Sequence, residues 1–371
     1  MLKSIQAGEI GKLGFGLMRL PRKDGAFDTV QINKMVDAYI ESGGAYFDAS
    51  YSYEGVEAAI CESVVKRYPR GAVQLATKLP LDMAGSTEDV KRMFNTSLKR
   101  LGTDYVDFYL LQDINAKCSR RAEELKAWDY LAELKAEGLI RHMGFSFSGK
   151  PEALEKILSK HPEAEFVQLQ INYLDWDDPD VQSRRMYEIV RKYDLPIIAM
   201  GPLKGGLLAS ENSPAASILR GADPHVSAAS WAFRFAAQLS SVFITLSGMS
   251  SLEQMADNIE TFACMKTLSA DEQATIEKAV GIINAEPRIV CLGCRHCTDD
   301  CPLDLRIPDL ISLYNDYLVH RTVTNLGDSY RWLTRDTGKA GDCAGCRVCE
   351  GSCRNKVGIA DTIERVAALF E

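Results

Sequence analysis

The feature that most constrains this chain is the spacing of its cysteines. Three of the eleven cysteines are scattered, and the other eight lie between residues 291 and 353. The first four of these eight follow the spacing C-x₂-C-x₂-C-x₃-C, and the last four repeat it. The N-terminal sequence MLKSIQAGEIGKLGFG shows no basic segment followed by an apolar one, so we expect no secretory signal. Clustered cysteines in such a chain indicate metal binding rather than disulfide bonds.

This spacing is typical of the [4Fe–4S] clusters of bacterial ferredoxins, in which the fourth cysteine of each run ligates the other cluster. The alternative is structural zinc, whose sites combine pairs of cysteines spaced C-x₂₋₄-C. A three-plus-one run that occurs twice fits iron and sulfide better than zinc. We therefore predict two clusters, the first held by Cys291, Cys294, Cys297 and Cys353, and the second by Cys343, Cys346, Cys349 and Cys301.

The segment between the two cysteine runs is too long for the linker of a compact ferredoxin. Pro308 begins an expected helix in which apolar residues recur at i, i+3 and i+4 up to Leu318. Further helices are expected at Tyr330–Leu333 and Ile359–Leu369. The sequence thus predicts a small α-helical ferredoxin-like domain over residues 286–371, preceded by one large domain over residues 1–285.

In the large domain, short apolar runs alternate with amphipathic stretches. Such βα units predict a parallel sheet covered by helices, and eight of them over about 260 residues match a (β/α)₈ barrel. The alternative, an open doubly wound sheet, usually carries G-x-G-x-x-G after its first strand, and this chain does not. The expected strands are Leu13–Met18, Ala45–Asp48, Val73–Lys78, Val106–Leu111, His142–Ser146, Phe166–Ile171, Pro196–Met200 and Val242–Leu246. The expected helices include Val30–Ile40, Val56–Val65, Glu88–Leu101, Ala122–Ala136, Val181–Lys192 and Val226–Ala237.

Composition limits the classes of partner. The formal net charge is −8 and the sequence pI is about 5.4, values that argue against nucleic acid or an anionic lipid surface. No apolar run approaches the roughly 20 residues that a membrane span needs. We expect a soluble, cytoplasmic protein that acts on a small-molecule substrate.

Charged and phenolic residues stand where two of the expected strands end. Asp48 ends one strand and Lys78 ends the next, and Tyr51 and Tyr53 follow Asp48 closely. In a (β/α)₈ barrel these strand ends meet at the catalytic face. A buried lysine needs a charged partner, and Asp48 is the obvious one. A lysine beside a phenol favours the phenolate, so we expect Lys78 to lower the tyrosine pKa and make the phenol a general acid.

These residues resemble those of the aldo-keto reductases. The resemblance begins with Phe47-Asp48-Ala49, Tyr53 and Glu57, continues with Thr77-Lys78, and covers roughly residues 5–285. It implies that Tyr53, rather than Tyr51, is the proton donor, and that Asp48 and Lys78 tune it. Together with the cysteine-rich tail, the chain resembles the iron–sulfur branch of that family.

The same resemblance implies a site for a nicotinamide cofactor. A loop from Ser247 to Ser251 is similar to the family's phosphate-binding loop, but it carries no lysine or arginine of its own. A 2′-phosphate usually needs such a cation, so the preference for NADP(H) over NAD(H) rests on the resemblance alone. The implied cofactor-binding residues are Ser146, Gln168, Met200, Gly201, Leu203, Gly248, Met249, Ser250, Gln254 and Asn258.

One catalytic position departs from the family pattern. The family has a histidine at the end of the fourth strand, and this chain has Gln112. An amide donates a hydrogen bond to a substrate oxygen but carries neither a proton nor a charge. Carbonyl polarisation therefore survives without proton relay, unless Gln112 marks a barrel that has lost its reductase activity.

Electron counting leaves the role of the clusters open. A nicotinamide transfers a hydride, and a [4Fe–4S] cluster accepts one electron, so direct exchange needs an intermediary such as a flavin. In one interpretation the barrel reduces or oxidises a carbonyl compound with NAD(P)H, and the clusters transfer electrons or dock a redox partner protein. In a second, FMN or a substrate in the barrel takes single electrons from the clusters. In a third, the chain is a non-catalytic electron carrier or redox sensor.

Overall fold

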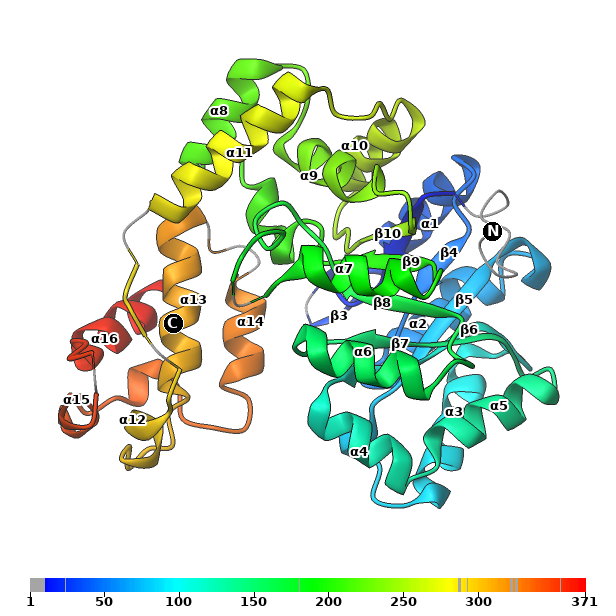
Figure 1. Ribbon diagram of the computed structural model, residues 1–371, viewed down its shortest axis with the longest axis horizontal. Helices are drawn as coiled ribbons and strands as arrows, with labels where there is room; N and C mark the ends of the chain where they lie inside the picture. The colour runs from blue at the N-terminus through cyan, green and yellow to red at the C-terminus, as the bar shows by residue number, and fades with distance from the viewer. Residues whose placement is uncertain are drawn as a thin grey trace. The chain divides into compact units, whose positions relative to one another are not determined.

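A closed barrel of eight parallel strands forms the larger part of the structure, a computed structural model shown in Figure 1. It describes residues 11–23, 25–179, 181–285, 288–291, 293–320, 323, 326–353 and 355–371. The barrel closes because β1 (Leu13–Gly16) pairs with both β4 (Tyr46–Asp48) and β10 (Val242–Ser247). Each strand overlaps a predicted run, so the predicted (β/α)₈ fold is confirmed. The other strands are β5 (Gln74–Leu79), β6 (Val106–Ile114), β7 (Ile140–Phe147), β8 (Phe166–Gln170) and β9 (Ile197–Met200).

Helices connect the successive strands, as the alternation of the sequence predicts. The predicted helix over Ala122–Ala136 is in fact two, because Lys126 adopts a left-handed φ of 51° at which a helix cannot continue. A short hairpin, β2 (Arg22–Lys23) and β3 (Ala26–Phe27), follows β1. The helices are α1 (Thr29–Glu41), α2 (Val56–Ile60), α3 (Thr87–Leu101), α4 (Ala116–Glu124), α5 (Ala127–Ala136), α6 (Pro151–Lys160), α7 (Ser183–Lys192), α8 (Pro214–Ala222), α9 (Ala228–Ala237) and α10 (Leu252–Ala263).

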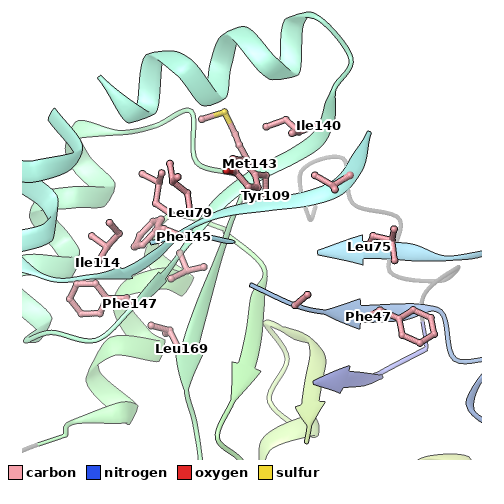
Figure 2. Close-up of a cluster of buried hydrophobic side chains, with 14 of the residues drawn as sticks. Phe47, Leu75, Leu79, Tyr109, Ile114, Ile140, Met143, Phe145, Phe147 and Leu169 are labelled. Atoms are coloured by element: carbon pink, nitrogen blue, oxygen red, sulfur yellow. The ribbon is translucent and has the colours of Figure 1, made fainter. Parts of the chain in front are cut away.

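The barrel is packed on both faces of its strands, because successive side chains of a strand point to opposite faces. Outward-facing side chains such as Tyr109, Phe145 and Leu169 form one large cluster with the surrounding helices (Figure 2). A smaller cluster that includes Phe108, Leu110 and other alternate residues fills the interior. The barrel is therefore a solid core, and its inward-facing polar residues stand above this apolar layer.

The C-terminal residues form a second, helical core. Helix α13 (Ile307–His320) packs against α16 (Ile359–Phe370) and α14 (Leu326–Leu333). Leu207, from the connection after β9, belongs to the same buried cluster. Helix α8 lies along α11 (Ala270–Ala285), as Figure 1 shows. Two short helices complete this part, α12 (His296–Asp299) and α15 (Val348–Gly351).

Contacts divide the chain into two compact units. The first runs to Pro202 and includes Ala232–Leu268, and the second comprises Leu203–Trp231 and Ser269–Glu371. The connection after β9 is thus part of the unit that holds the cysteine runs. The domain boundary after residue 285 stays a prediction.

Within the described residues, no helix is both long enough and apolar enough to cross a membrane.

Candidate active site and cysteine-lined cavities

The barrel brings the polar strand ends together through the alternation of its side chains. On β6, Phe108 and Leu110 face the interior, so Gln112, two residues further on, lies on the same face. The same two-residue step takes Tyr46 to Asp48 on β4 and Ala76 to Lys78 on β5. These side chains converge at the carboxyl ends of the strands, where (β/α)₈ enzymes carry their chemistry.

Lys78 and Asp48 form a buried ion pair, as the sequence predicts. Their exposed fractions are only 2% and 4%. The Lys78 ammonium donates to Asp48 Oδ1 and, at 2.7 Å, to the carbonyl oxygen of Ala49. Asp48 Oδ2 accepts a further bond from Gln168 Nε2 at 3.1 Å, across the barrel from β8. Two partners from two strands therefore hold the carboxylate, and a buried pair satisfied in this way has a fixed geometry.

The two candidate tyrosines occupy different surroundings. The ring centroid of Tyr53 lies 5.3 Å from the Lys78 ammonium nitrogen. The ring of Tyr51 instead lies under the guanidinium of Arg100, at 4.6 Å. Tyr53 is thus the phenol that the structure brings to the buried ion pair, and Tyr51 is held at the edge of the same loop.

The expected effect of Lys78 on the tyrosine is outweighed by burial. Burial raises the pKa of Tyr53 above its ordinary value, whereas the Lys78 ammonium lowers it and the carboxylates of Asp48 and Asp113 raise it. The net direction is upward, contrary to the prediction that Lys78 leaves the Tyr53 pKa lowered. The prediction rested on the nearby Lys78 charge, whereas the low-dielectric surroundings of Tyr53 disfavour a phenolate more strongly. Tyr53 consequently keeps its proton at neutral pH.

Gln112 is held in one orientation by two hydroxyl groups. Its carbonyl oxygen accepts from Ser50 Oγ at 2.5 Å and from Ser52 Oγ at 3.3 Å. Its Nε2 donates to Asp113 Oδ2 at 3.4 Å. Because the carbonyl oxygen is occupied, the amide presents its N–H groups as donors, which is the role open to a glutamine at this position.

A second buried carboxylate anchors the loop that carries the tyrosines. Glu57, at the start of α2, is 1% exposed and accepts from Thr77 Oγ1 at 2.7 Å. Arg100 reaches it at 3.4 Å and also donates to the carbonyl oxygen of Tyr51 at 3.3 Å. These bonds tie the loop after β4 to the end of β5, immediately before Lys78.

The predicted cofactor-binding residues lie on the strand ends beside this centre. Ser146 and Gln168 are directly paired between β7 and β8, and Gln170 pairs with Met200 between β8 and β9. Ser146 Oγ accepts from the backbone N–H of Asp113 at 2.8 Å. Met200 and Gly201 belong to the first compact unit, and Leu203 belongs to the second.

The predicted phosphate loop leads from β10 into α10. A side chain at Gly16 would stand 3.3 Å from the Ser247 carbonyl oxygen, whereas one at Gly248 would meet nothing closer than 3.9 Å. Gln254 and Asn258 bind the loop itself, through Ser250 N–H at 2.7 Å and Ser247 Oγ at 2.8 Å. Met249 is buried beneath it. Gly248 is exposed, and because it has no side chain its backbone is accessible to a ligand that approaches closely.

The eight clustered cysteines line two separate cavities. One cavity is lined by Cys291, Cys294, Cys297 and Cys353. The other is lined by Cys301, Cys343, Cys346 and Cys349. The structure thus gathers the cysteines into the two predicted sets, each containing the fourth cysteine of the other run.

Both cysteine runs share one backbone conformation. Gly293 and Gly345 each have a φ of 64°. The next non-cysteine residues, Arg295 and Arg347, have left-handed φ values of 64° and 57° and precede α12 and α15. Two short helices that begin in the same way pack against each other. The repeat in the sequence is therefore a repeat in structure.

The thiols of the second cavity lie close to one another. Burial, together with Glu350 and neighbouring cysteines, raises the pKa of the Cys349 thiol to about 11. Metal ligation requires thiolates, so a bound metal would have to displace the thiol proton. Val357 N–H donates to Cys353 Sγ at 3.4 Å, the kind of bond that tunes cluster potentials.

Sequence reasoning missed several residues of the site. Ser50 and Ser52 continue the inward-facing positions after Asp48, and that two-residue step was the available signal. Asp113 was not singled out because it sits in an irregularity of β6, which leaves no mark in the sequence. Arg100 lies on α3, far along the chain from the tyrosines that it supports.

The parallel barrel with its polar strand ends has the architecture of a (β/α)₈ enzyme. Residues 12–280 match the Aldo/keto reductase family, and residues 290–358 match the 4Fe-4S dicluster domain. The first match covers more than half of the chain, so the chain belongs to the aldo/keto reductase family. It is an oxidoreductase of that type that carries a 4Fe-4S domain.

Curated relatives agree with this assignment. An aldo-keto reductase from Mycolicibacterium vanbaalenii is 29% identical over 256 residues, covering 68% of this chain and 85% of the relative. The aldo-keto reductase str7 of Strobilurus tenacellus is 29% identical over 215 residues, covering 54% of this chain and 61% of the relative.

Solved structures share the fold. An aldo-keto reductase from Bacillus halodurans aligns with a TM-score of 0.59 at 23% identity, covering 73% of this chain and 92% of that one. An aldo/keto reductase from Klebsiella pneumoniae, in complex with NADP and acetate, aligns with a TM-score of 0.60 at 20% identity. The alignment covers 72% of this chain and 91% of that one.

Proposed function

We propose that this protein reduces or oxidises the carbonyl group of a small molecule with a nicotinamide cofactor, NADP(H) or NAD(H). The observation that carries the proposal is the phenol of Tyr53 beside the buried Lys78–Asp48 pair. When bound, the cofactor supplies or accepts the hydride. The NADP of the Klebsiella pneumoniae structure supports this cofactor.

The side chains of the barrel then provide proton transfer and orientation. Tyr53 holds a proton at its hydroxyl and donates it to the carbonyl oxygen during reduction. Lys78 offsets the cost of the phenolate that remains, and Asp48 fixes the lysine in place. Gln112, oriented by Ser50, donates a hydrogen bond to the same carbonyl oxygen. Polarisation and protonation thus come from two separate groups.

The cofactor site that we propose is built from strand ends and one loop. Ser146 and Gln168 would face the nicotinamide, with Met200, Gly201 and Leu203 following β9. Gly248, Met249, Ser250, Gln254 and Asn258 would form the phosphate end, where α10 starts and backbone N–H groups favour an anion. The exposed backbone of Gly248, which carries no side chain, is the observation that fits such a group.

We further propose two [4Fe–4S] clusters, one in each cysteine-lined cavity. Cys291, Cys294, Cys297 and Cys353 would ligate the first, and Cys343, Cys346, Cys349 and Cys301 the second. Cys294 and Cys346 are exposed, so each cluster would reach the surface and exchange electrons with a redox partner protein. The eleven unpaired thiols suit the reducing cytoplasm.

The test uses protein purified without oxygen. We expect about eight iron and eight sulfide per chain, and oxidation of NADPH or NADH, followed at 340 nm, with aldehydes or ketones present. The broad absorption of the clusters without resolved flavin bands is expected, whereas such bands would support FMN as the intermediary. Bound cofactor without turnover of any carbonyl compound would favour the electron carrier instead.

A further inference from the structure

The end of β6 departs from regular strand geometry directly beside the candidate active site. The register between β6 and β7 shifts between Leu111 and Ile114, and Asp113 adopts a left-handed φ of 50°. Its backbone N–H donates to Ser146 Oγ at 2.8 Å. Bulges of this kind re-aim a side chain at a barrel rim, and a non-glycine residue at positive φ is uncommon.

The carboxylate that this bulge presents is exposed and forms no ion pair among the described residues. The side chain of Asp113 is exposed, and it accepts a hydrogen bond from the neutral amide of Gln112 at 3.4 Å. Among the residues that the structure describes, no lysine, arginine or histidine forms an ion pair with it. Because Lys78 is already paired with Asp48, Asp113 adds a negative charge beside that buried pair.

The Asp113 carboxylate lies close enough to Tyr53 and Lys78 to affect their pKa values. The Asp113 carboxylate raises the pKa of Tyr53, after the larger effects of burial, Lys78 and Asp48. Burial lowers the pKa of Lys78, but Asp48, Tyr53 and Asp113 outweigh it and raise the value. Burial raises the pKa of the Cys118 thiol, Asp82 and Asp113 raise it further, and Asn115 and Lys117 lower it, so a second carboxylate and a lysine both lie nearby.

We propose that Asp113 is a specificity-determining residue that favours carbonyl substrates bearing a positive charge and disfavours those bearing a carboxylate. The inference rests on the proposed carbonyl chemistry, and it names the charge class of its substrate. A negative charge at the entrance attracts a cationic group and repels an anionic one. Discrimination against the wrong charge is as much a part of specificity as attraction of the right one.

The test compares three benzaldehydes that differ in the para substituent: trimethylammonio, nitro and carboxylate. For each aldehyde, kcat/KM of Asp113→Asn is divided by kcat/KM of the unaltered protein. This ratio cancels differences in intrinsic reactivity among the three aldehydes. An exposed charge pair contributes up to about 1 kcal/mol, or about fivefold. We expect Asp113→Asn to lose about fivefold on the cationic aldehyde, change little on the neutral one, and gain on the anionic one.

Two controls separate this effect from general damage. Asp104→Asn removes an exposed carboxylate from the opposite end of β6, and it should leave all three ratios near one. Raising the ionic strength should shrink the Asp113 effect, because salt screens exposed charges. A change that is equal for all three aldehydes reflects Tyr53 or folding and would contradict charge selection.

Binding of the matching benzamides, which are not reduced, gives a readout independent of turnover. Calorimetry on the cofactor-loaded protein should show the same order of affinities, lost in Asp113→Asn. Turnover without charge discrimination would overturn this inference and leave the proposed function intact. If none of the three aldehydes is reduced, the result counts against the proposed function. The benzamide affinities then test Asp113 independently: equal affinities for the three benzamides would overturn the proposed charge selection.

Discussion

The ammonium of Lys78 lies 5.3 Å from the ring centroid of Tyr53 while it donates to the carboxylate of Asp48. One cation thus serves two acidic groups, of which one is ionised and the other keeps its proton. Tyr53 would transfer the proton, whereas Asp48 holds the Lys78 ammonium in place. It makes the effects of substitution at the three positions distinguishable.

Replacement of the phenol tests the proton donor. Tyr53→Phe should reduce kcat by about 10²–10⁴-fold, the usual contribution of general acid catalysis, and leave cofactor affinity nearly unchanged. Lys78→Met should be similarly severe. Tyr51→Phe is the matched control, because its ring packs under Arg100, and should retain most activity. Steady-state kinetics measure kcat, and fluorescence titration measures cofactor affinity. A loss of kcat below tenfold in Tyr53→Phe would point to another acid.

The pH dependence of kcat follows from the raised pKa of Tyr53. The reduction needs the protonated phenol, and a pKa above the ordinary value keeps the proton on to higher pH. Activity should therefore persist through neutral and mildly alkaline pH and fall only above about pH 10, the ordinary tyrosine value. A basic limb centred near neutral pH in the pH–rate profile would show that some other group titrates.

Restoring a histidine at position 112 tests the role of the amide. Gln112→His should raise the reduction of simple aldehydes, which benefit from an imidazole near the carbonyl, and lower activity on bulkier carbonyl compounds. Ser50→Ala should weaken turnover without altering cofactor affinity, because Gln112 loses its closest fixing bond. Kinetics on a panel of aldehydes and ketones measure these effects. Unchanged, negligible aldehyde reduction in Gln112→His would indicate a barrel without catalysis.

Exchange of the fourth ligands between the cysteine runs predicts an asymmetric defect. Cys301 follows the first run in sequence but lines the cavity of the second. Cys301→Ser should therefore damage the second cluster more than the first, and Cys353→Ser should do the reverse. Iron analysis and electron paramagnetic resonance of the reduced variants separate the two clusters. Selective loss of the first cluster in Cys301→Ser would refute the exchange.

The sequence predicts the barrel well because its strands are short, mostly apolar runs that alternate with amphipathic stretches. Asp48 and Lys78 could be paired from the sequence because both stand at strand ends, whereas the role of Gln112 stays a prediction. The break at Lys126 and the bulge at Asp113 were not predictable, because both depend on a left-handed backbone at residues other than glycine. The direction of the Tyr53 pKa was likewise set by burial, a quantity that depends on the whole fold.

The membership of Leu207 in the C-terminal core bears on how this protein can be engineered. That side chain is 4% exposed among residues such as Ile311 and Ile363, and α8 rests on α11. Removing everything after residue 285 would expose Leu207 and leave an aggregation-prone apolar surface on the connection after β9. The C-terminal residues therefore cannot be moved to another protein as a separate domain. The segment Leu203–Trp231 would have to be transferred with them.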